Sequence, residues 1–319
     1  MKETLNLVDL FCGAGGFAEG FRRAGFKILV AVDNSPSASK TFKANFPYSI
    51  VLAEDIKELS AHILEKLAGD VDVVIGSPPC EPFTGANPKR MKNPLDRLYR
   101  DPIGQLVLHF ARIVAELRPK IFVMENVPGI LDLRDELENI FRKLGYRNIY
   151  FNKLLAEDYG TPSHRLRVFI SNIRIKPKPS REKITVEKAL EDLPEPGTPG
   201  VLNHEPPPLS HRKARRISRL KWGQALIYYE GAHSRRLPNL IRLDPRRIAP
   251  TVLGSSRFIH PYQDRLLTVR EQARLMGFPD THIFLGGKDE QYNQVGEAVP
   301  PPLAYAIAKE VKKYIELNT

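Results

Sequence analysis

The sequence predicts an α/β fold in which a parallel sheet is covered by helices on both faces and is joined to a second, irregular region. Three observations support this prediction. Across residues 1–173, short apolar runs alternate with amphipathic stretches, as they do in repeated strand–helix units. Beyond residue 173 the alternation stops and proline becomes frequent. The chain has 319 residues, which is enough for two domains or for one large domain with an insertion.

Apolar runs and helical spacing place the elements of the first region. We expect strands over residues 5–11, 28–32, 49–53, 72–76, 121–126, 148–155 and 167–173. We expect helices over residues 16–24, 36–45, 58–68, 103–117 and 134–144. The longest of these helices places Leu106, Phe110 and Ile113 on one face. Because the strands are continuous apolar runs, helices should cover both faces of the sheet.

The second region has fewer signals of regular structure. Residues 174–182 read as a linker, and residues 193–211 hold too many prolines for a helix or strand. We expect a short helix between them, at 184–193, and a longer one at 267–278. The last helix should begin at the prolines around residue 300, because proline fits the first turn of a helix.

Positive charge is concentrated in one part of the chain. The net charge is +11, and residues 174–260 carry 18 Lys and Arg against 8 Asp and Glu. Residues 1–173 carry 23 Lys and Arg against 21 Asp and Glu. A polyanion is the natural partner for a charge focused in this way, although a solvated basic surface would have the same composition.

Other classes of protein are disfavoured by composition. No apolar run approaches the ~18 residues of a membrane span, and the N-terminus lacks the layout of a signal peptide. We therefore expect a cytoplasmic protein with no membrane partner. The two cysteines, Cys12 and Cys80, cannot build a disulfide framework, and no Cys/His spacing suits zinc. We expect no metal site.

A glycine-rich turn follows the first strand, in the stretch DLFCGAGGFAEGF. Gly13, Gly15 and Ala18 fit the pattern G-x-G-x-x-G/A, which lets a ligand approach the backbone at the start of a helix. Asp33 ends the next strand, where a carboxylate would take ribose hydroxyls. Asp55, after the third strand, could hold an adenine amino group or could cap a helix.

The stretch GSPPCEPFTG ends the fourth strand, at the same carboxyl edge of the sheet as the glycine turn. Two prolines fix the backbone just before Cys80, so its thiol cannot swing away. A structural cysteine would normally lie within a strand or on a helix face. We therefore interpret Cys80 as a reactive thiol, and Cys12 as a small packing residue.

Further candidates lie at the ends of later strands. Glu125 ends the fifth strand, where a carboxyl group is costly unless it is paired or used. Arg165 and Arg167 alternate along a strand and therefore project to one face. Taken alone, such arginines would be interpreted as a surface ion pair.

Six motifs occur in this order: DLFCGAGGF, GSPPCEPFT, ENVPGIL, YGTPSHRLRVF, RLLTVREQARLMGFPD and QVGEAVPPPLA. Together they resemble the ordered motif set of DNA cytosine-5 methyltransferases of the restriction-modification type. The resemblance implies a Rossmann-like S-adenosylmethionine-dependent methyltransferase fold with a smaller irregular target-recognition domain. It assigns residues 1–173 and 300–319 to the catalytic domain, and residues 174–299 to target recognition, with the basic insert at 174–260. It also implies that the last helix packs beside the first.

The resemblance also implies a mechanism. The Cys80 thiolate would add to C6 of cytosine, which turns C5 into a competent nucleophile. Glu125 would bond the N3/N4 edge of the base and supply a proton. Arg165 and Arg167 would hold the base oxygen and nearby phosphates. The cofactor would be S-adenosylmethionine, and the resemblance assigns its pocket to Phe11, Gly13, Ala14, Gly15, Gly16, Asp33, Asp55, Pro78, Leu106, Glu297 and Ala298.

The expected partner is double-stranded DNA containing a specific short sequence, with the target cytosine flipped out of the stack. Residues 81–101 would form a mobile basic lid over the site. The candidate DNA contacts are Lys89, Arg90, Arg97, Arg212, Arg215, Arg216, Arg235 and Arg236. We expect a monomer, and the restriction-modification type admits a cognate restriction endonuclease as a partner. Removing the basic insert is expected to abolish DNA binding and leave cofactor binding nearly intact.

The sequence departs from the family pattern in places, and other functions can be weighed against it. Glu81 and Thr84 replace the usual Gln and Ser, Ser163 replaces Gln, and Glu297 replaces Asn. A nicotinamide dehydrogenase would explain the glycine turn but not Cys80, and an amino-methyltransferase usually has an aromatic residue at that place. A catalytically silent DNA-binding protein would not need these groups. A tRNA cytosine-5 methyltransferase of the DNA-enzyme type shares every catalytic residue and is the nearest alternative.

Overall fold

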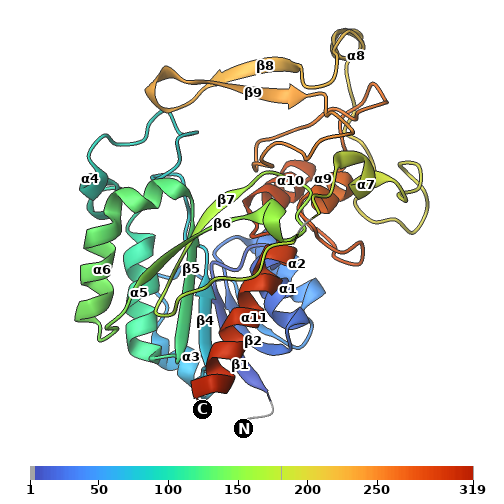
Figure 1. Cartoon of the computed structure of the whole chain (residues 1–319). Helices are drawn as coiled ribbons and strands as arrows, with labels where there is room; N and C mark the ends of the chain where they lie inside the picture. Colours follow the sequence, from blue (N-terminus) through green and yellow to red (C-terminus); the bar gives the residue numbers. More distant parts are fainter. Residues whose placement is uncertain (1–3, 181, 319) are drawn as a thin grey trace.

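The computed structural model describes residues 4–180 and 182–318 (Figure 1). The strands of the main sheet are β1 (Leu5–Leu10), β2 (Phe26–Val32), β3 (Ile50–Leu52), β4 (Val73–Gly76), β5 (Ile121–Asn126), β6 (Tyr150–Leu155) and β7 (Leu166–Ser171). The connecting helices are α1 (Gly16–Arg23), α2 (Pro36–Asn45), α3 (Ala61–Ala68), α4 (Pro94–Tyr99), α5 (Leu106–Leu117), α6 (Arg134–Lys143) and the 3₁₀ helices η1 (Pro128–Leu133) and η2 (Ala156–Tyr159). The predicted α/β class is confirmed.

The sheet has the strand order β3-β2-β1-β4-β5-β7-β6. Strands β1 to β5 pair in parallel, but β7 runs antiparallel to both β5 and β6. The prediction of a wholly parallel sheet was therefore wrong for β7. Only residues 156–165 link β6 to β7, which is too short for the helical crossover that parallel neighbours need. As a result, the first residues of β7 lie at the edge where β1, β2, β4 and β5 end.

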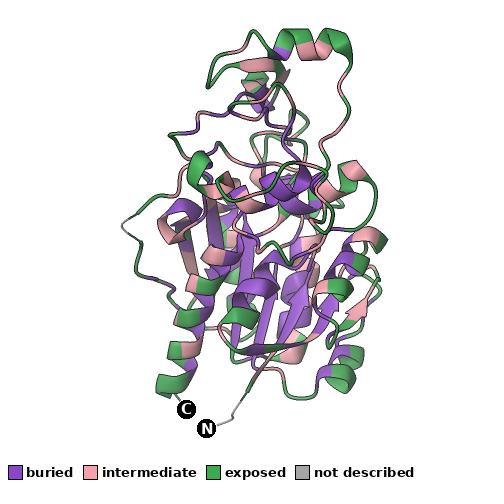
Figure 2. Ribbon diagram, turned by 90° about the vertical axis from the view of Figure 1, so that its right-hand side faces the viewer, coloured by how far each residue is buried: buried purple, intermediate pink, exposed green. Residues whose placement is uncertain are grey.

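Hydrophobic cores fill both sides of the sheet, as its continuous apolar strands predict. One core packs α1, α2 and the last helix, α11 (Pro301–Asn318), against one face. The other packs α3, α5 and α6 against the opposite face. Figure 2 shows the strands buried between these helices. Val73 and Val74 illustrate the alternation, because consecutive strand residues enter opposite cores.

The last helix packs beside the first, as expected from the resemblance. Gly20 in α1 provides the close approach, because a Cβ there would lie 2.3 Å from the Cβ of Ala304 in α11 (Figure 1). Among the described residues, no helix is both long enough and apolar enough to cross a bilayer.

The second region holds α7 (Val186–Leu190), α8 (His211–Ile217), η3 (Ala232–Ser234), α9 (Val269–Leu275), α10 (Lys288–Glu297) and a hairpin of β8 (Ala225–Glu230) and β9 (Arg236–Ile241). Helices α7 and α9 fall within predicted helices, whereas the hairpin and α10 were not predicted. Helix α10 is polar, with little apolar periodicity, and β9 contains Pro238. A third hydrophobic core joins α7, α9 and α10 to Ala14 in the glycine turn.

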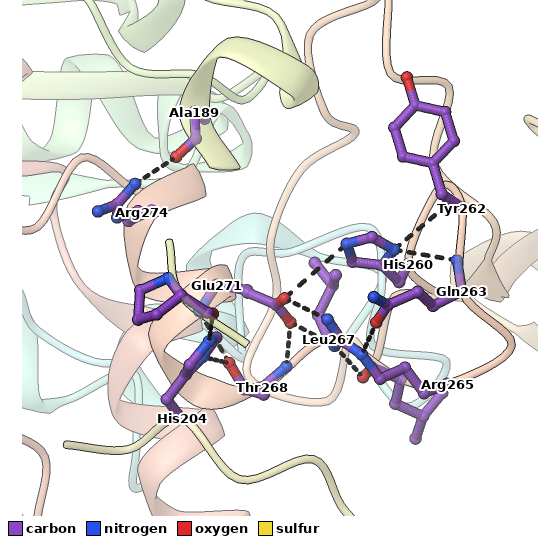
Figure 3. Close-up of polar contacts among 12 residues, drawn as sticks. Ala189, His204, His260, Tyr262, Gln263, Arg265, Leu267, Thr268, Glu271 and Arg274 are labelled. Atoms are coloured by element: carbon purple, nitrogen blue, oxygen red, sulfur yellow. Dashed lines mark hydrogen bonds and ion pairs between the residues drawn. The ribbon is translucent and has the colours of Figure 1, made fainter. Parts of the chain in front are cut away.

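The start of α9 is fixed by a buried polar network (Figure 3). Arg265 donates from Nη1 and Nη2 to the Glu271 carboxylate, at 2.8 and 2.7 Å. The same carboxylate accepts from the backbone N–H of Thr268, which completes a capping box. His260 lies 4.0 Å from Glu271, and burial lowers its pKa to about 4, so this imidazole is neutral near pH 7.

Candidate active site

The glycine turn between β1 and α1 is tightly specified. Phe11 has a φ of 58° and Gly13 a φ of 53°, a region that a non-glycine residue adopts only under constraint. The N–H of Gly13 donates to Asp33 Oδ2 at 2.8 Å, and that of Ser35 donates to Oδ1 at 2.9 Å. Burial raises the pKa of the Asp33 carboxyl, and these two backbone donors oppose the rise. The structure thus brings Asp33 to the turn, as the sequence predicts.

The other predicted cofactor residues do not all lie at the turn. Ala298 lies at the turn, because a Cβ on Gly16 would be 3.0 Å from the Ala298 Cβ and 2.4 Å from the Val299 carbonyl. Pro78 follows the end of β4, and Leu106 begins α5 and packs against the core beneath that helix. Asp55 is half-exposed, accepts from the N–H of Lys57 and pairs with the Lys57 ammonium at 3.7 Å. Among the described residues, no hydrogen bond or ion pair joins Asp55 to the turn.

Cys80 lies in a tight turn after β4. Its carbonyl accepts the N–H groups of Phe83 and Thr84, both at 2.9 Å, so the backbone around the thiol is fixed. Burial raises the pKa of the Cys80 thiol to about 11, and the neighbouring Glu125 carboxylate raises it as well. Arg167 and Arg165 act in the opposite direction. Glu81 raises the Cys80 pKa as well, so the thiol is protonated at neutral pH in this state, and four charged groups together with burial control its ionisation.

Glu125 is held by an arginine near the start of β7. Its Oε1 lies 2.9 Å from Arg167 Nε, and both side chains are buried. The next residue, Asn126, donates from Nδ2 to the Pro78 carbonyl at 3.1 Å, which ties the end of β5 to the Cys80 turn. The structure brings Glu125, Arg167 and Cys80 together because β7 runs antiparallel and begins at this edge of the sheet.

Arg165 is fully buried beside them. Its Nη1 donates to the carbonyls of Val252 at 2.8 Å and Gly296 at 2.9 Å, so it joins the second region to the site. Its Nε has no hydrogen-bond partner among the described residues. Burial lowers the pKa of Arg165 to about 9, and the Arg167 charge lowers it further. A buried donor left unpaired is costly, and a ligand oxygen would satisfy it.

The loop of residues 81–101 differs in part from the prediction. Arg97 was expected to contact DNA, but it is 4% exposed and its guanidinium is used within the protein. It pairs with Asp132 at 2.6 Å and donates to the carbonyls of Met91 and Lys92. Because all its branches are engaged, Arg97 organises the loop and is not free for a phosphate. Lys89 is exposed, whereas Arg90 donates to the Phe83 carbonyl at 3.1 Å.

The arginines of the second region that were predicted to contact DNA lie at the surface. Arg212, Arg215 and Arg216 are exposed on α8, and Arg235 and Arg236 are exposed at the hairpin turn. Figure 1 shows the hairpin extending toward the loop that contains α4. There the N–H of Ala232 donates to the Gly85 carbonyl at 3.0 Å. The hairpin and the loop that follows Cys80 therefore meet at their tips.

Glu297 lies near both the glycine turn and the loop that follows Cys80, since the carboxylates of Asp33 and Glu81 act on it. Its Oε1 is close to Gly254, since a Cβ added there would lie 2.9 Å away. Desolvation raises the pKa of the Glu297 carboxyl to about 7, and the carboxylates of Glu81 and Asp33 raise it further, while Arg165 lowers it. Glu81 and Glu297, the two carboxylates that depart from the family pattern, thus influence each other electrostatically.

This pKa predicts a pH-dependent contribution to stability. The folded-state pKa of Glu297 exceeds its unfolded value of about 4.5. The stability that Glu297 contributes to the folded state is therefore fully present below about pH 4.5 and is lost as the pH rises through about 7. We expect the thermal midpoint of the wild-type protein to fall, relative to that of Glu297→Gln, between about pH 5 and pH 8. Calorimetry of both proteins across this range measures the difference. A difference that stays constant with pH would contradict the assignment.

The chain is similar in sequence to known proteins over nearly its whole length. Residues 5–313 match the family model of C-5 cytosine-specific DNA methylases. A putative type II methyltransferase of Methanocaldococcus jannaschii is 50% identical over 317 residues, covering 98% of this chain and 100% of that protein. The type II methyltransferase M.DdeI of Desulfomicrobium norvegicum is 33% identical over 380 residues, covering 98% and 89%.

Solved structures show the same architecture. A putative DNA modification methyltransferase encoded within an E. coli prophage matches with a TM-score of 0.77 at 29% identity, covering 99% of this chain and 100% of that chain. Spodoptera frugiperda DNMT2 matches with a TM-score of 0.64 at 19% identity, covering 97% and 99%, and this second likeness concerns the fold alone.

Proposed function

The chain belongs to the family of C-5 cytosine-specific DNA methylases, and from this premise we propose that it transfers a methyl group from S-adenosylmethionine to C5 of cytosine in a short double-stranded DNA sequence. Membership makes it a DNA (cytosine-5)-methyltransferase. The methyl donor, the covalent step and the flipped base are parts of the proposal. The single observation that carries it is the meeting of Cys80, Glu125 and Arg167 at the carboxyl edge of the sheet, with Glu125 and Arg167 2.9 Å apart.

The turn after β1 suits the proposed cofactor. A Cβ on Gly13 would meet nothing within 4 Å, so space is open beside the backbone. Asp33, partly accessible at the end of β2, can accept ribose hydroxyls through the carboxylate lone pairs that its two backbone donors leave free, and the face of Phe11 can contact a sulfonium. S-adenosylmethionine supplies an electrophilic methyl group when bound there. Asp33 and the turn then serve to orient it.

We propose that arrival of the base switches the ionisation of Cys80. Glu125 would bond the N3/N4 edge of cytosine and take up the proton that the Cys80 thiol releases, which removes the negative charge that now raises the Cys80 pKa. It would then donate this proton to N3 as the sulfur bonds to C6. Arg165 and Arg167 would remain as positive charges beside the sulfur. The Cys80 thiolate then bonds to C6, C5 becomes nucleophilic and is methylated, and loss of the C5 proton lets Cys80 leave.

Arg165 would hold the base oxygen, because its buried Nε still lacks a partner among the described residues. Lys89, Arg90 and the exposed arginines of α8 and the hairpin would contact the DNA backbone. We propose that residues 174–260 recognise the target. The contact between Gly85 and Ala232 would then join the recognition hairpin to the loop that carries Cys80.

Methyl transfer with labelled S-adenosylmethionine tests the proposal. We expect label at C5 of cytosine in mixed-sequence duplex DNA, concentrated at one short sequence when the marks are mapped at base resolution. A Cys80→Ala preparation, purified in parallel, controls for contaminating host enzymes. Label on adenine, on N4 of cytosine, or on transfer RNA alone would contradict the proposed substrate.

A further inference from the structure

The glycine turn accepts a hydrogen bond from a side chain that is far away in sequence. His282 Nε2 lies 2.8 Å from the carbonyl of Ala14, in the middle of the turn. Since a carbonyl can only accept, the histidine donates through Nε2–H. His282 is 3% exposed, and Ala14 is 2% exposed. A buried carbonyl of the turn is therefore satisfied by a residue between α9 and α10, beyond the basic insert.

The imidazole is held as a neutral donor. Phe278 and Phe284 surround its ring, with centroids at 4.7 and 5.2 Å, and Phe46 lies at 6.4 Å. Burial lowers the pKa of His282 to about 4, the bond to Ala14 opposes this, and Arg270 and Arg22 lower it further. Near neutral pH the ring thus carries one N–H, and the Ala14 bond determines which nitrogen bears it.

The segment that carries His282 is hydrogen-bonded to α2. Asn45, at the end of α2, donates from Nδ2 to the Ile283 carbonyl at 2.8 Å, and accepts from the Ile283 N–H at 2.9 Å. Thr41 in α2 accepts the N–H of Leu285 at 2.8 Å. These bonds hold the backbone on the C-terminal side of His282 in one register against α2.

The proline-rich part of the basic insert also forms hydrogen bonds with this segment. Asn203 donates from Nδ2 to the Phe284 carbonyl at 2.8 Å and accepts the Phe284 N–H at 2.9 Å. Arg270, fully buried in α9, donates from Nη2 to the His282 carbonyl at 2.6 Å and from Nε to the Leu202 carbonyl. His204 is also anchored, with its Nδ1 2.9 Å from Thr268 Oγ1 (Figure 3).

We propose that His282 is a positioning residue for the cofactor turn, and that Asn203 braces it from the insert. Without the Nε2–H donor, the Ala14 carbonyl would be buried and unpaired, and the turn would relax away from the geometry that receives the cofactor. The inference rests on the proposed binding of S-adenosylmethionine at this turn. It also argues against the expectation that the insert can be removed with cofactor binding intact, because Asn203 lies within residues 174–260.

A matched pair of variants separates the hydrogen bond from packing. His282→Phe keeps an aromatic ring among Phe278 and Phe284 but removes the donor, whereas His282→Gln keeps an N–H donor. We expect His282→Phe to weaken S-adenosylmethionine binding, measured by calorimetry on the full chain, by roughly three- to tenfold, the worth of one neutral hydrogen bond. His282→Gln should recover most of this. The KM for the cofactor should rise in parallel, while kcat and DNA affinity change little.

Asn203→Ala provides the second arm, with Arg236→Ala as a control at the hairpin turn. We expect Asn203→Ala to weaken cofactor binding in the same direction and Arg236→Ala to weaken DNA binding only. Wild-type affinity for His282→Phe overturns the inference, as does an equal loss in His282→Phe and His282→Gln. If the wild-type protein itself does not bind S-adenosylmethionine, the proposed function fails instead, so the two failures are distinguishable.

Discussion

Replacing Cys80 with serine is expected to abolish methyl transfer, lowering kcat by at least about 1,000-fold, as loss of a catalytic nucleophile commonly does. A serine hydroxyl ionises far less readily than a thiol, and it is a far weaker nucleophile than a thiolate. DNA and cofactor affinity should stay within a fewfold of wild type, because the backbone at Cys80 is fixed by hydrogen bonds of its carbonyl rather than of its thiol.

A covalent trap gives this prediction its sharpest readout. Duplex DNA with 5-fluorocytosine at the target cannot lose a proton from C5, so the Cys80–C6 bond should persist and be found on the Cys80 peptide by mass spectrometry. Cys12 is the matched control, because it is the chain's other cysteine and is buried in the core under α1. Cys12→Ala should still crosslink. A wild-type protein that methylates DNA without forming the adduct would refute the covalent mechanism.

The candidate residues at the strand ends could be predicted from sequence, because each is a reactive or charged residue that directly follows an apolar run. Cys80 after two prolines, Glu125 after a buried strand and Asp33 after a turn-and-strand pair each point to the carboxyl edge. The structure brings Cys80, Glu125 and Arg167 together there. Asp55 was predicted by the same logic; its carboxylate pairs with Lys57, and its role toward an adenine stays a prediction.

What could not be predicted depends on partners far apart in sequence. The apolar run of β7 indicates burial but not direction, which the short β6–β7 connection decides. Arg97 lies in a basic loop, and only the folded chain shows Asp132 beside it. Likewise, nothing around His282 marks it in the sequence, because its role arises from a carbonyl 268 positions away. Long-range polar pairing is thus the information that sequence patterns lack.

Glu125→Gln should have the second large effect, a loss of roughly 100- to 10,000-fold in kcat, the range for removing a general acid–base group. The amide is nearly isosteric, so the packing around β5 should survive. It cannot carry the proton that the base edge requires, and it cannot couple the charge state of position 125 to the ionisation of Cys80. Cofactor affinity should be unchanged, which single-turnover kinetics and calorimetry together would establish.

The same substitution also reports on the thiol. Removing the Glu125 charge removes one cause of the raised Cys80 pKa and leaves Arg167 and Arg165 in place, so alkylation of Cys80 at pH 8 should become faster even as catalysis falls. Glu19→Gln is the matched control, because Glu19 is equally buried and pairs with Arg22 at 2.8 Å away from the site. It should alter stability only. A faster alkylation of Cys80 together with a lower kcat would indicate that Glu125 handles a proton. Structural damage to the site would lower kcat as well, but it would not make the sulfur ionise more readily in a protein that still binds its cofactor.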